Sequence, residues 1–406
     1  MTELGERPGG PRALLADRDY LRLWLVGGFA NAVRWLELLA AGVFAYDQTG
    51  SGLVVAAMTA ARMLPMLLIG ALAGAVADTL NRRTLLLAGQ GATGLAASVV
   101  AVLALADLLT LWHIAAAGTV SGIVWASEMA VRRRMVGEVA GPTRIASAIA
   151  LDTVTNGMTR MIGPALGGFL LETVGLVGVY ILSAALYLSG FALVFGLRWT
   201  QETRPLRIGR IPGEIAAGFA AARRSDTIMA VLAVTVVMNA FGFSYTAMIP
   251  PIGRHEFGVS ATLVGVLASA EAGGSLLGGL LIASGRLRPD RGRLFLAGAF
   301  GLMTAVALAA LAPWYVLAFA LLLAGGFGTA SFAAMQSTLI LTEAPPEMRS
   351  RLMGIVTVCI GTGPLGVIAV GALSDHIGAS NAMLAMALTG AAALVLIRLR
   401  WPGLGR

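Results

Sequence analysis

The chain has 406 residues, of which 57% are hydrophobic and only 12% are charged, and its formal net charge is +8. This balance excludes an ordinary soluble domain, in which about a quarter of the residues are charged. Apolar stretches of about 20 residues, the length that crosses a bilayer, recur along the sequence, so we expect an all-α integral membrane protein.

The apolar stretches predict twelve transmembrane helices, near residues 21–46, 52–76, 84–106, 110–130, 146–170, 176–197, 228–250, 261–284, 294–311, 314–338, 353–373 and 380–397. The polar first 20 residues hold no apolar core, so no cleaved signal peptide is expected. All 29 basic residues are arginines, and Arg254 is the only one in an expected outer loop. The positive-inside rule therefore predicts a multi-pass plasma-membrane protein with both termini in the cytoplasm. The basic inner face suits anionic lipid headgroups and does not indicate nucleic-acid binding.

The two halves of the chain resemble each other. Gly163-Pro164 in the fifth helix recurs as Gly363-Pro364 in the eleventh, and Asn31 has Asn239 as its counterpart. Repeats related by an axis along the membrane normal are typical of transporters. The predicted division is a cytoplasmic segment 1–20, a six-helix bundle 21–197, a cytoplasmic linker 198–227, a second six-helix bundle 228–397 and a tail 398–406. Residues 211–224 of the linker form either an amphipathic surface helix or a plain tether.

Charged side chains at membrane depth indicate a transport pathway, because an ionised group is costly there unless it faces protein or water. The charged side chains expected near mid-depth are Arg34, Glu37, Arg62, Asp152, Arg160 and Glu271. The surplus of arginines favours an anionic cargo, since guanidinium binds carboxylate or phenolate oxygens in a fork. The predicted substrate-binding residues are Asn31, Arg34, Trp35, Arg62, Trp125, Asp152, Asn156, Arg160, Asn239, Phe243 and Tyr245.

Glu271 is the first candidate for proton coupling, with Glu37 the second. The second half of the chain has no arginine at the depth of Glu271. Low-dielectric surroundings disfavour a charged carboxylate, so such an acid can exchange protons near neutral pH. The fifth helix also carries a polar stripe from Asp152 to Arg160. It faces either a water-filled path or an internal network in which Arg34 and Arg62 pair with Glu37 and Asp152.

The segment 74–83, GAVADTLNRR, resembles the signature loop of the major facilitator superfamily, Gly-x-x-x-Asp-Arg-x-Gly-Arg-Arg. Thr79 replaces an arginine and Asn81 replaces a glycine. Asparagine tolerates the left-handed conformation better than other non-glycine residues, so we expect the turn to survive. The resemblance implies a cytoplasmic gate in which Asp78 contacts a helix start in the other half. It also implies that Arg82 and Arg83 hold helix C-terminal carbonyls or acids.

A second element, Gly163-Pro164-Ala-Leu-Gly167-Gly168, is similar to one found in exporters of the antiporter type. Close helix packing is the alternative role for such small residues. The stretches DRDYLRLWLVGGFAN, Asp47-Gln-Thr-Gly-Ser51 and Pro346-Glu-Met-Arg349-Ser-Arg351 resemble the branch with siderophore exporters and macrolide-efflux proteins. The gate residues implied by these resemblances are Gly74, Asp78, Arg82, Arg83, Gly163 and Pro164.

We expect a twelve-helix major facilitator fold that exports an amphipathic small molecule of anionic character, such as a siderophore or drug, in exchange for protons. Uptake of a small organic anion and flipping of a lysophospholipid are rival transport functions, and a membrane receptor or scaffold is the alternative outside transport. No motif indicates an enzyme. The single cysteine and three scattered histidines give no metal-ligand spacing, so neither metal nor cofactor is expected. The expected partners are the cargo, protons and the bilayer, with the protein a monomer.

Overall fold

The computed structural model describes residues 11–197, 211–284 and 290–404, and every regular element in these ranges is helical, as the sequence predicts. The α-helices are α1 (Pro11–Ala16), α2 (Arg18–Thr49), α3 (Gly52–Thr79), α4 (Arg82–Leu105), α5 (Leu111–Phe195), α6 (Ile211–Ala222), α7 (Asp226–Val237), α8 (Ile249–Pro251), α9 (Ala261–Ala283), α10 (Arg291–Ala310), α11 (Tyr315–Glu343), α12 (Arg349–Ile360), α13 (Gly363–Ile377) and α14 (Ala379–Arg400). Short 3₁₀- or π-helical turns are η2 (Met238–Gly242), η3 (Ser244–Met248), η4 (Ile252–Glu256) and η5 (Pro346–Met348).

Within the described part of the chain, eight helices are long and apolar enough to cross a membrane. One of them, α5, has 85 residues but takes positive φ at Gly141 (71°) and Gly175 (68°). A straight helix of this length would extend about 130 Å, several times the thickness of a bilayer core. Glycine tolerates the left-handed backbone at which the chain reverses. The number of twelve spans stays a prediction.

Side-chain caps fix where several helices begin. The Asp17 carboxylate accepts hydrogen bonds from the backbone N–H groups of Asp19 and Tyr20, at 3.0 and 3.2 Å, and so starts α2. Ser225 and Asp290 cap α7 and α10 in the same way. Such caps satisfy N–H groups that the first turn of a helix leaves without an intrahelical partner.

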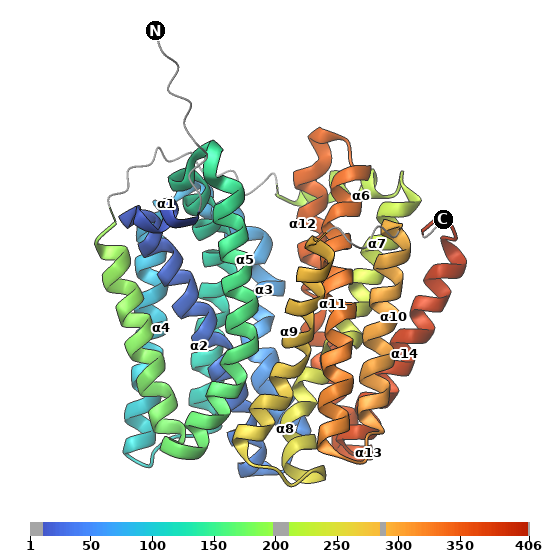
Figure 1. The fold of residues 1–406 in the computed structure, drawn as a ribbon. Helices are drawn as coiled ribbons and strands as arrows, with labels where there is room; N and C mark the ends of the chain where they lie inside the picture. Colours follow the sequence, from blue (N-terminus) through green and yellow to red (C-terminus); the bar gives the residue numbers. More distant parts are fainter. Residues whose placement is uncertain (1–10, 198–210, 285–289, 405–406) are drawn as a thin grey trace.

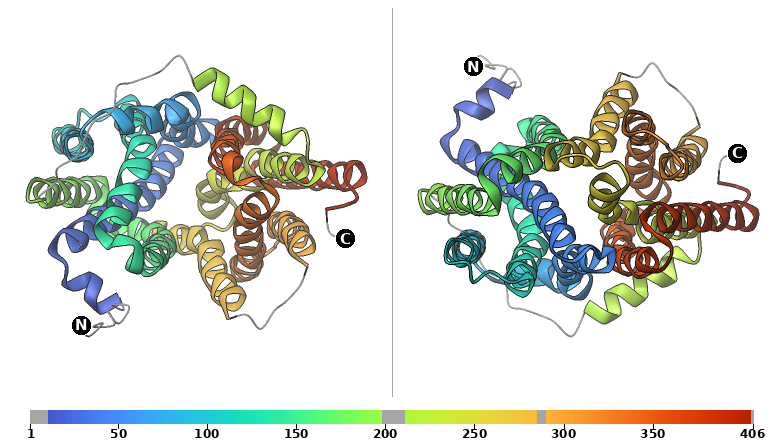
Figure 2. Two further views of the ribbon diagram at one scale, coloured as in Figure 1. Left: turned by 90° about the horizontal axis from the view of Figure 1, so that it is seen from above. Right: turned by 90° about the horizontal axis from the view of Figure 1, so that it is seen from below.

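The helices lie in two groups, one coloured blue to green and the other yellow to red (Figures 1 and 2). We call the end of the bundle with α1 and the end of α14 the proximal end, and the opposite end, with α8 and the end of α13, the distal end (Figure 1). At the proximal end α6 packs on α12, where Gly218 lies against Ile355. The linker segment 211–222 is thus a packed helix in the structure.

The two groups meet in backbone contact toward the distal end. A Cβ atom on Gly168 of α5 would collide with the carbonyl group of Ala261 at the start of α9. A Cβ atom on Gly371 of α13 would likewise collide with the Cβ atom of Ala56 in α3. Two helix pairs, α5 with α9 and α3 with α13, therefore hold the distal end of the two groups together.

Candidate transport site

The described helices place a buried ion pair between α2 and α3. Glu37 and Arg62 are only 4% and 6% exposed, and the Arg62 guanidinium donates to the Glu37 carboxylate. A second nitrogen of Arg62 donates to the backbone carbonyl of Arg34 at 2.9 Å. A small cavity of about 20 Å³ borders the pair, with Tyr180 and Gly118 among its lining residues. The pair satisfies both charges within the first group of helices.

Arg34 has a different environment from Arg62. Its guanidinium donates to Asn31 Oδ1 at 2.8 Å and lies 4.4 Å from the centre of the Trp125 ring. It forms no ion pair with a carboxylate of the described residues. A cation over an aromatic face is attracted by the ring quadrupole but keeps its full charge. Arg34 is therefore a mid-depth arginine without a carboxylate ion-pair partner among the described residues, and the alternative in which it pairs with Asp152 is not found.

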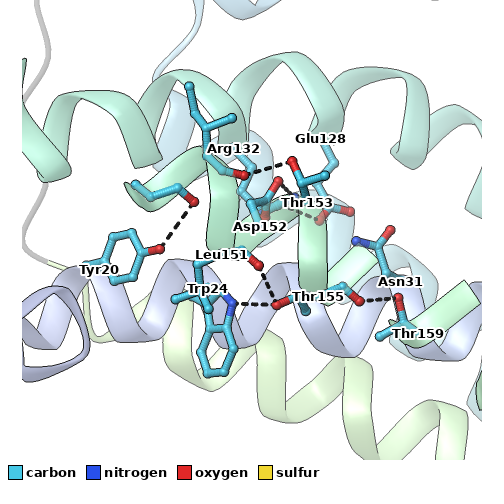
Figure 3. A network of polar contacts seen from close by, with 12 residues as sticks. Tyr20, Trp24, Asn31, Glu128, Arg132, Leu151, Asp152, Thr153, Thr155 and Thr159 are labelled. Carbon is cyan, nitrogen blue, oxygen red and sulfur yellow. Dashed lines mark hydrogen bonds and ion pairs between the residues drawn. The ribbon is translucent and has the colours of Figure 1, made fainter. Parts of the chain in front are cut away.

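Asp152 instead pairs with Arg132, within the first group (Figure 3). The Asp152 carboxylate accepts two hydrogen bonds from the Arg132 guanidinium, at 2.6 and 3.3 Å. Oε1 of Glu128 lies 3.7 Å from Nε of Arg132. One turn along α5, Thr155 accepts a hydrogen bond from the Trp24 indole at 2.8 Å. This face of the predicted polar stripe binds α2 and the segment of α5 before Gly141.

The stripe ends in a contact between the two groups of helices. The Arg160 guanidinium of α5 donates to the Glu271 carboxylate of α9, and Arg160 also lies 5.6 Å from the centre of the Trp35 ring. The expectation that Glu271 has no arginine partner is wrong. It considered only arginines in the second half of the chain, whereas the partner comes from the first half, 111 residues earlier.

Two buried polar atoms beside this pair lack a hydrogen-bond partner among the described residues. They are Oε1 of Glu271 and Nε1 of Trp35. Glu271 is only 3% exposed, while 28% of the Arg160 side chain is exposed. A buried polar atom without a partner is costly. The Arg160–Glu271 pair thus has one unsatisfied acceptor and one unsatisfied donor next to it.

The other predicted binding residues occupy varied positions. Asn156 is exposed on α5. Asn239 donates to the Thr235 carbonyl of its own helix at 2.9 Å. Phe243 packs on Phe332 with ring centres 6.1 Å apart, and Tyr245 is 3% exposed. Of these four residues, only Asn156 is exposed.

The predicted gate loop is described in part. The side chain of Asp78 and the surroundings of Gly74 lie outside the described residues. Arg82 pairs with Glu138 at 2.6 Å, and Arg83 donates to the backbone carbonyl of Phe195, at the end of α5, at 2.6 Å. These are the kinds of partner expected for the two arginines, and their role in gating stays a prediction.

Asn81 does not take the expected left-handed conformation. Its φ is −61°, and its side chain accepts hydrogen bonds from the backbone N–H groups of Arg83 at 2.9 Å and Thr84 at 3.3 Å. It is the N-cap of α4. An asparagine at this position can satisfy the first turn of the helix directly, whereas a glycine has no side chain with which to do so.

Gly163 and Pro164 lie where α5 packs closely on other helices. A Cβ atom on Gly163 would collide with Trp35 of α2, and the Pro164 carbonyl lies where a Cβ atom of Gly265 in α9 would be. The element therefore contacts both groups of helices, which fits its alternative role in packing. Its role in gating stays a prediction.

Several residues that join the two groups at the distal end were assigned no role from sequence. Arg254 forms two hydrogen bonds with Asp47, at 2.8 and 2.9 Å, and Glu172 and Asp375 contact the starts of helices in the opposite group. The available signal was the repeat that places Glu172-Thr-Val-Gly175 and Asp375-His-Ile-Gly378 after equivalent helices. Among the described residues, no group of three or more potential metal ligands comes together.

Comparison with known proteins gives matches over nearly the whole chain. The sequence profile of the transmembrane secretion effector family, one of the major facilitator families, matches residues 10–404. The multidrug efflux pump Tap of Mycolicibacterium fortuitum is 25% identical over 385 residues, which cover 91% of this chain and 94% of that protein. The enterobactin exporter EntS of Shigella flexneri is 25% identical over 312 residues, covering 75% of this chain and 72% of that protein.

Solved structures with a similar fold are also transporters. A POT family transporter in complex with 5-aminolevulinic acid aligns with a TM-score of 0.77 at 13% identity, covering 100% of this chain and 98% of that one. A bacterial homologue of the human lysosomal transporter Spinster, inward-facing and unoccupied, aligns with a TM-score of 0.72 at 16% identity, covering 96% and 98%. At these identities the similarity is one of fold.

Proposed function

Because the chain belongs to the transmembrane secretion effector family of the major facilitator superfamily, we propose that it exports an amphipathic small molecule of anionic character in exchange for protons. Membership of this family makes it a multi-pass membrane transporter of small molecules. The similarity to a multidrug efflux pump and an enterobactin exporter supports export and a siderophore or drug as cargo.

The proposed topology has twelve spans in two six-helix halves, with both termini on the cytoplasmic side of the plasma membrane. It follows from the inner location of nearly all arginines. In this orientation the distal end is the outer end. The backbone contacts of α5 with α9 and of α3 with α13 then lie at the outer side, which supports a state of alternating access in which the outer side is closed.

The observation that carries the proposal is the ion pair between Arg160 and the buried Glu271, which joins the two groups of helices. Protonation of Glu271 removes its negative charge and weakens this link. A link that exists in one conformation and not in another biases the equilibrium between the two. A proton at Glu271 can therefore influence how the halves move, which is the requirement for coupling.

Cargo binding is proposed to use the Arg34 guanidinium, which has no carboxylate partner among the described residues, and the unsatisfied Oε1 of Glu271. The anionic end of the cargo binds Arg34, and a hydroxyl or amine donates to Oε1 of Glu271. A donor at Glu271 is compatible with the charged carboxylate and competes with its proton. When Glu271 is protonated, binding of the cargo therefore releases the proton, as exchange requires.

The same ion pair supports one rival function, the uptake of an organic anion together with a proton. If the anion binds Arg160 instead of Arg34, it displaces Glu271 from the arginine. An acid left without its cationic partner in a buried site binds a proton more readily. Binding of the anion then takes up a proton. The two functions therefore differ in whether binding of the cargo releases a proton, as in export, or takes one up, as in the rival uptake function.

Two measurements test the proposal, with enterobactin and a panel of drugs as cargo. In weakly buffered detergent solution, cargo binding should release protons, whereas proton uptake would favour the rival function. In proteoliposomes with an imposed pH gradient, Glu271→Gln should still bind cargo but lose pH-driven accumulation, because the neutral side chain mimics the protonated acid. Glu256→Gln, at an exposed glutamate, is the matched control. Normal pH-driven transport by Glu271→Gln would exclude Glu271 and leave Glu37 as the candidate.

A further inference from the structure

Two carboxylates at the distal end each bind the first turn of a helix in the opposite group. Asp375, near the end of α13, accepts hydrogen bonds from the Ser51 hydroxyl at 2.6 Å and the Leu53 backbone N–H at 3.2 Å, at the start of α3. Glu172, in α5 just before Gly175, accepts a hydrogen bond from the Thr262 backbone N–H at 3.0 Å, at the start of α9.

The start of α9 depends on this contact. Its own N-cap residue, Ser260, makes no side-chain hydrogen bond to the first turn. The first four N–H groups of a helix have no intrahelical partner, and the positive end of the helix favours a negative charge. Glu172 therefore supplies from the opposite group the acceptor that Ser260 does not provide.

The two contacts are built in the same way. Each carboxylate follows four residues after a glycine, in the segments GFLLE (168–172) and GALSD (371–375). Residues four apart lie on the same face of a helix. Gly168 and Gly371 are the residues at which α5 meets α9 and α13 meets α3 in backbone contact. The glycine lets the helices approach, and the carboxylate one turn later reaches the start of the opposing helix.

We propose that Glu172 and Asp375 are a reciprocal pair of helix caps that hold the distal end closed and must separate for it to open. The proposal rests on the alternating access proposed above and adds the residues that stabilise one of its two states. Because donor and acceptor belong to different groups of helices, both caps exist only while the distal end is closed. Their loss should shift the equilibrium toward the distal-open state.

The test measures distances between spin labels by pulsed electron spin resonance in a variant whose Cys359 is replaced by serine. One label pair, at exposed Leu108 and Leu311, reports on the distal end, and a second, at exposed Thr143 and Glu347, reports on the proximal end. Glu172→Ala and Asp375→Ala should each raise the ratio of distal-open to distal-closed molecules about fivefold, as loss of a helix cap implies. The double variant should raise it about 25-fold, since the caps belong to separate helix pairs.

The chain provides a matched control in Glu256. This exposed glutamate accepts a hydrogen bond from the Ser380 backbone N–H at 3.0 Å and so caps the start of α14, also at the distal end. Here, however, both partners belong to the second group of helices. Glu256→Ala removes a cap of the same kind without touching the interface, so the ratio should not change. Shifts no larger in Glu172→Ala and Asp375→Ala than in Glu256→Ala would overturn the proposal.

Two features keep this result separate from the transport proposal. The distance measurement needs neither cargo nor a pH gradient, so it can fail while proton-driven export is normal, and the reverse also holds. All three carboxylates are exposed, so the variants should fold, which their unfolding temperatures would verify. Asp375→Asn, which keeps one acceptor oxygen for the Leu53 N–H but loses the charge and the second acceptor oxygen, should give a shift between those of wild type and Asp375→Ala. A shift as large as that of the alanine variant would contradict the capping contact.

Discussion

Several charged side chains at membrane depth lie against a specific partner side chain within the protein. Glu37 pairs with Arg62, Asp152 pairs with Arg132, and Arg34 lies against Trp125. The cost of removing two charges from water is largely offset only when they meet with good geometry and further hydrogen bonds. The additional bond from Arg62 to the backbone of α2 fits this requirement.

Replacing only one partner of the Glu37–Arg62 pair should destabilise the protein strongly. Glu37→Gln or Arg62→Gln should each lower the free energy of unfolding by about 3 to 5 kcal/mol, because each leaves a buried charge without its partner. The double variant should recover a large part of this loss. Thermal and denaturant unfolding in detergent would measure the three values.

The partly exposed pair of Arg22 and Asp19 is the control for that experiment. Their side chains are 33% and 31% exposed. Asp19→Asn should therefore change the free energy of unfolding by less than about 1 kcal/mol. A similar cost for the buried and the exposed pair would show that burial does not determine the energetics.

Arg34 is the residue at which cargo charge should matter. Arg34→Gln should weaken binding of an anionic cargo by more than about 1 kcal/mol, since a charge-assisted hydrogen bond is lost. A neutral cargo should bind almost as before. Calorimetric titration of a charged and an uncharged analogue would compare them, and equal losses for both would exclude a direct role of the Arg34 charge.

At the scale of the helices, small residues decide which elements can approach. Gly168→Ala would place a methyl group against the carbonyl of Ala261. Overpacking of this kind costs about 1 to 3 kcal/mol, and here it acts only while α5 and α9 are in contact. Hydrogen exchange measured by mass spectrometry should become faster at the start of α9.

Gly279 offers a comparison within α9 itself. No atom of a neighbouring residue lies within 4 Å of the position that its Cβ would occupy. Gly279→Ala should leave exchange at the start of α9 unchanged and stabilise the helix slightly, because alanine is the better helix former. Equal exchange in the two alanine variants would show that the Gly168 contact does not hold the helices together.

The start of α4 depends on Asn81. Asn81→Ala should lower the free energy of unfolding by about 1 kcal/mol through loss of the N-cap, whereas Asn81→Asp should preserve it. If the position instead required a left-handed backbone, Asn81→Gly would be stabilising. The observed φ of −61° predicts that it is not, and denaturant unfolding of the three variants would decide.

At the scale of the whole molecule, the ion pair of Arg160 and Glu271 links the two groups. Arg160→Glu should lower the unfolding temperature by bringing two acids together. The exchanged variant, Arg160→Glu with Glu271→Arg, should recover part of the loss, with a coupling energy of about 0.5 to 3 kcal/mol. Differential scanning fluorimetry over the complete cycle would measure it. Additive effects of the two substitutions would show that the side chains do not interact.

Prediction from sequence succeeded where a property depends on residues close together in the chain. The all-helical class and the family, inferred from GAVADTLNRR and related segments, are confirmed. The reading of Asn81 was wrong because the family pattern places a glycine there, and the pattern does not show that a side chain can cap α4 instead. The expectation that Glu271 has no arginine partner was wrong because it considered only arginines in the same half of the chain, whereas the partner, Arg160, comes from the other half.

The sequence by itself determined that this is a helical membrane protein, because hydropathy and arginine placement act through the local cost of moving side chains into lipid. The segment GAVADTLNRR indicated its transporter family. The glycine and carboxylate of GFLLE and GALSD were also visible as a repeat. Only the tertiary structure decided that these carboxylates cap helices of the opposite group, and that Arg160 reaches a glutamate 111 residues away. The periodicity of a helix fixes which residues share a face, but which two faces meet depends on the packing of helices distant in the chain.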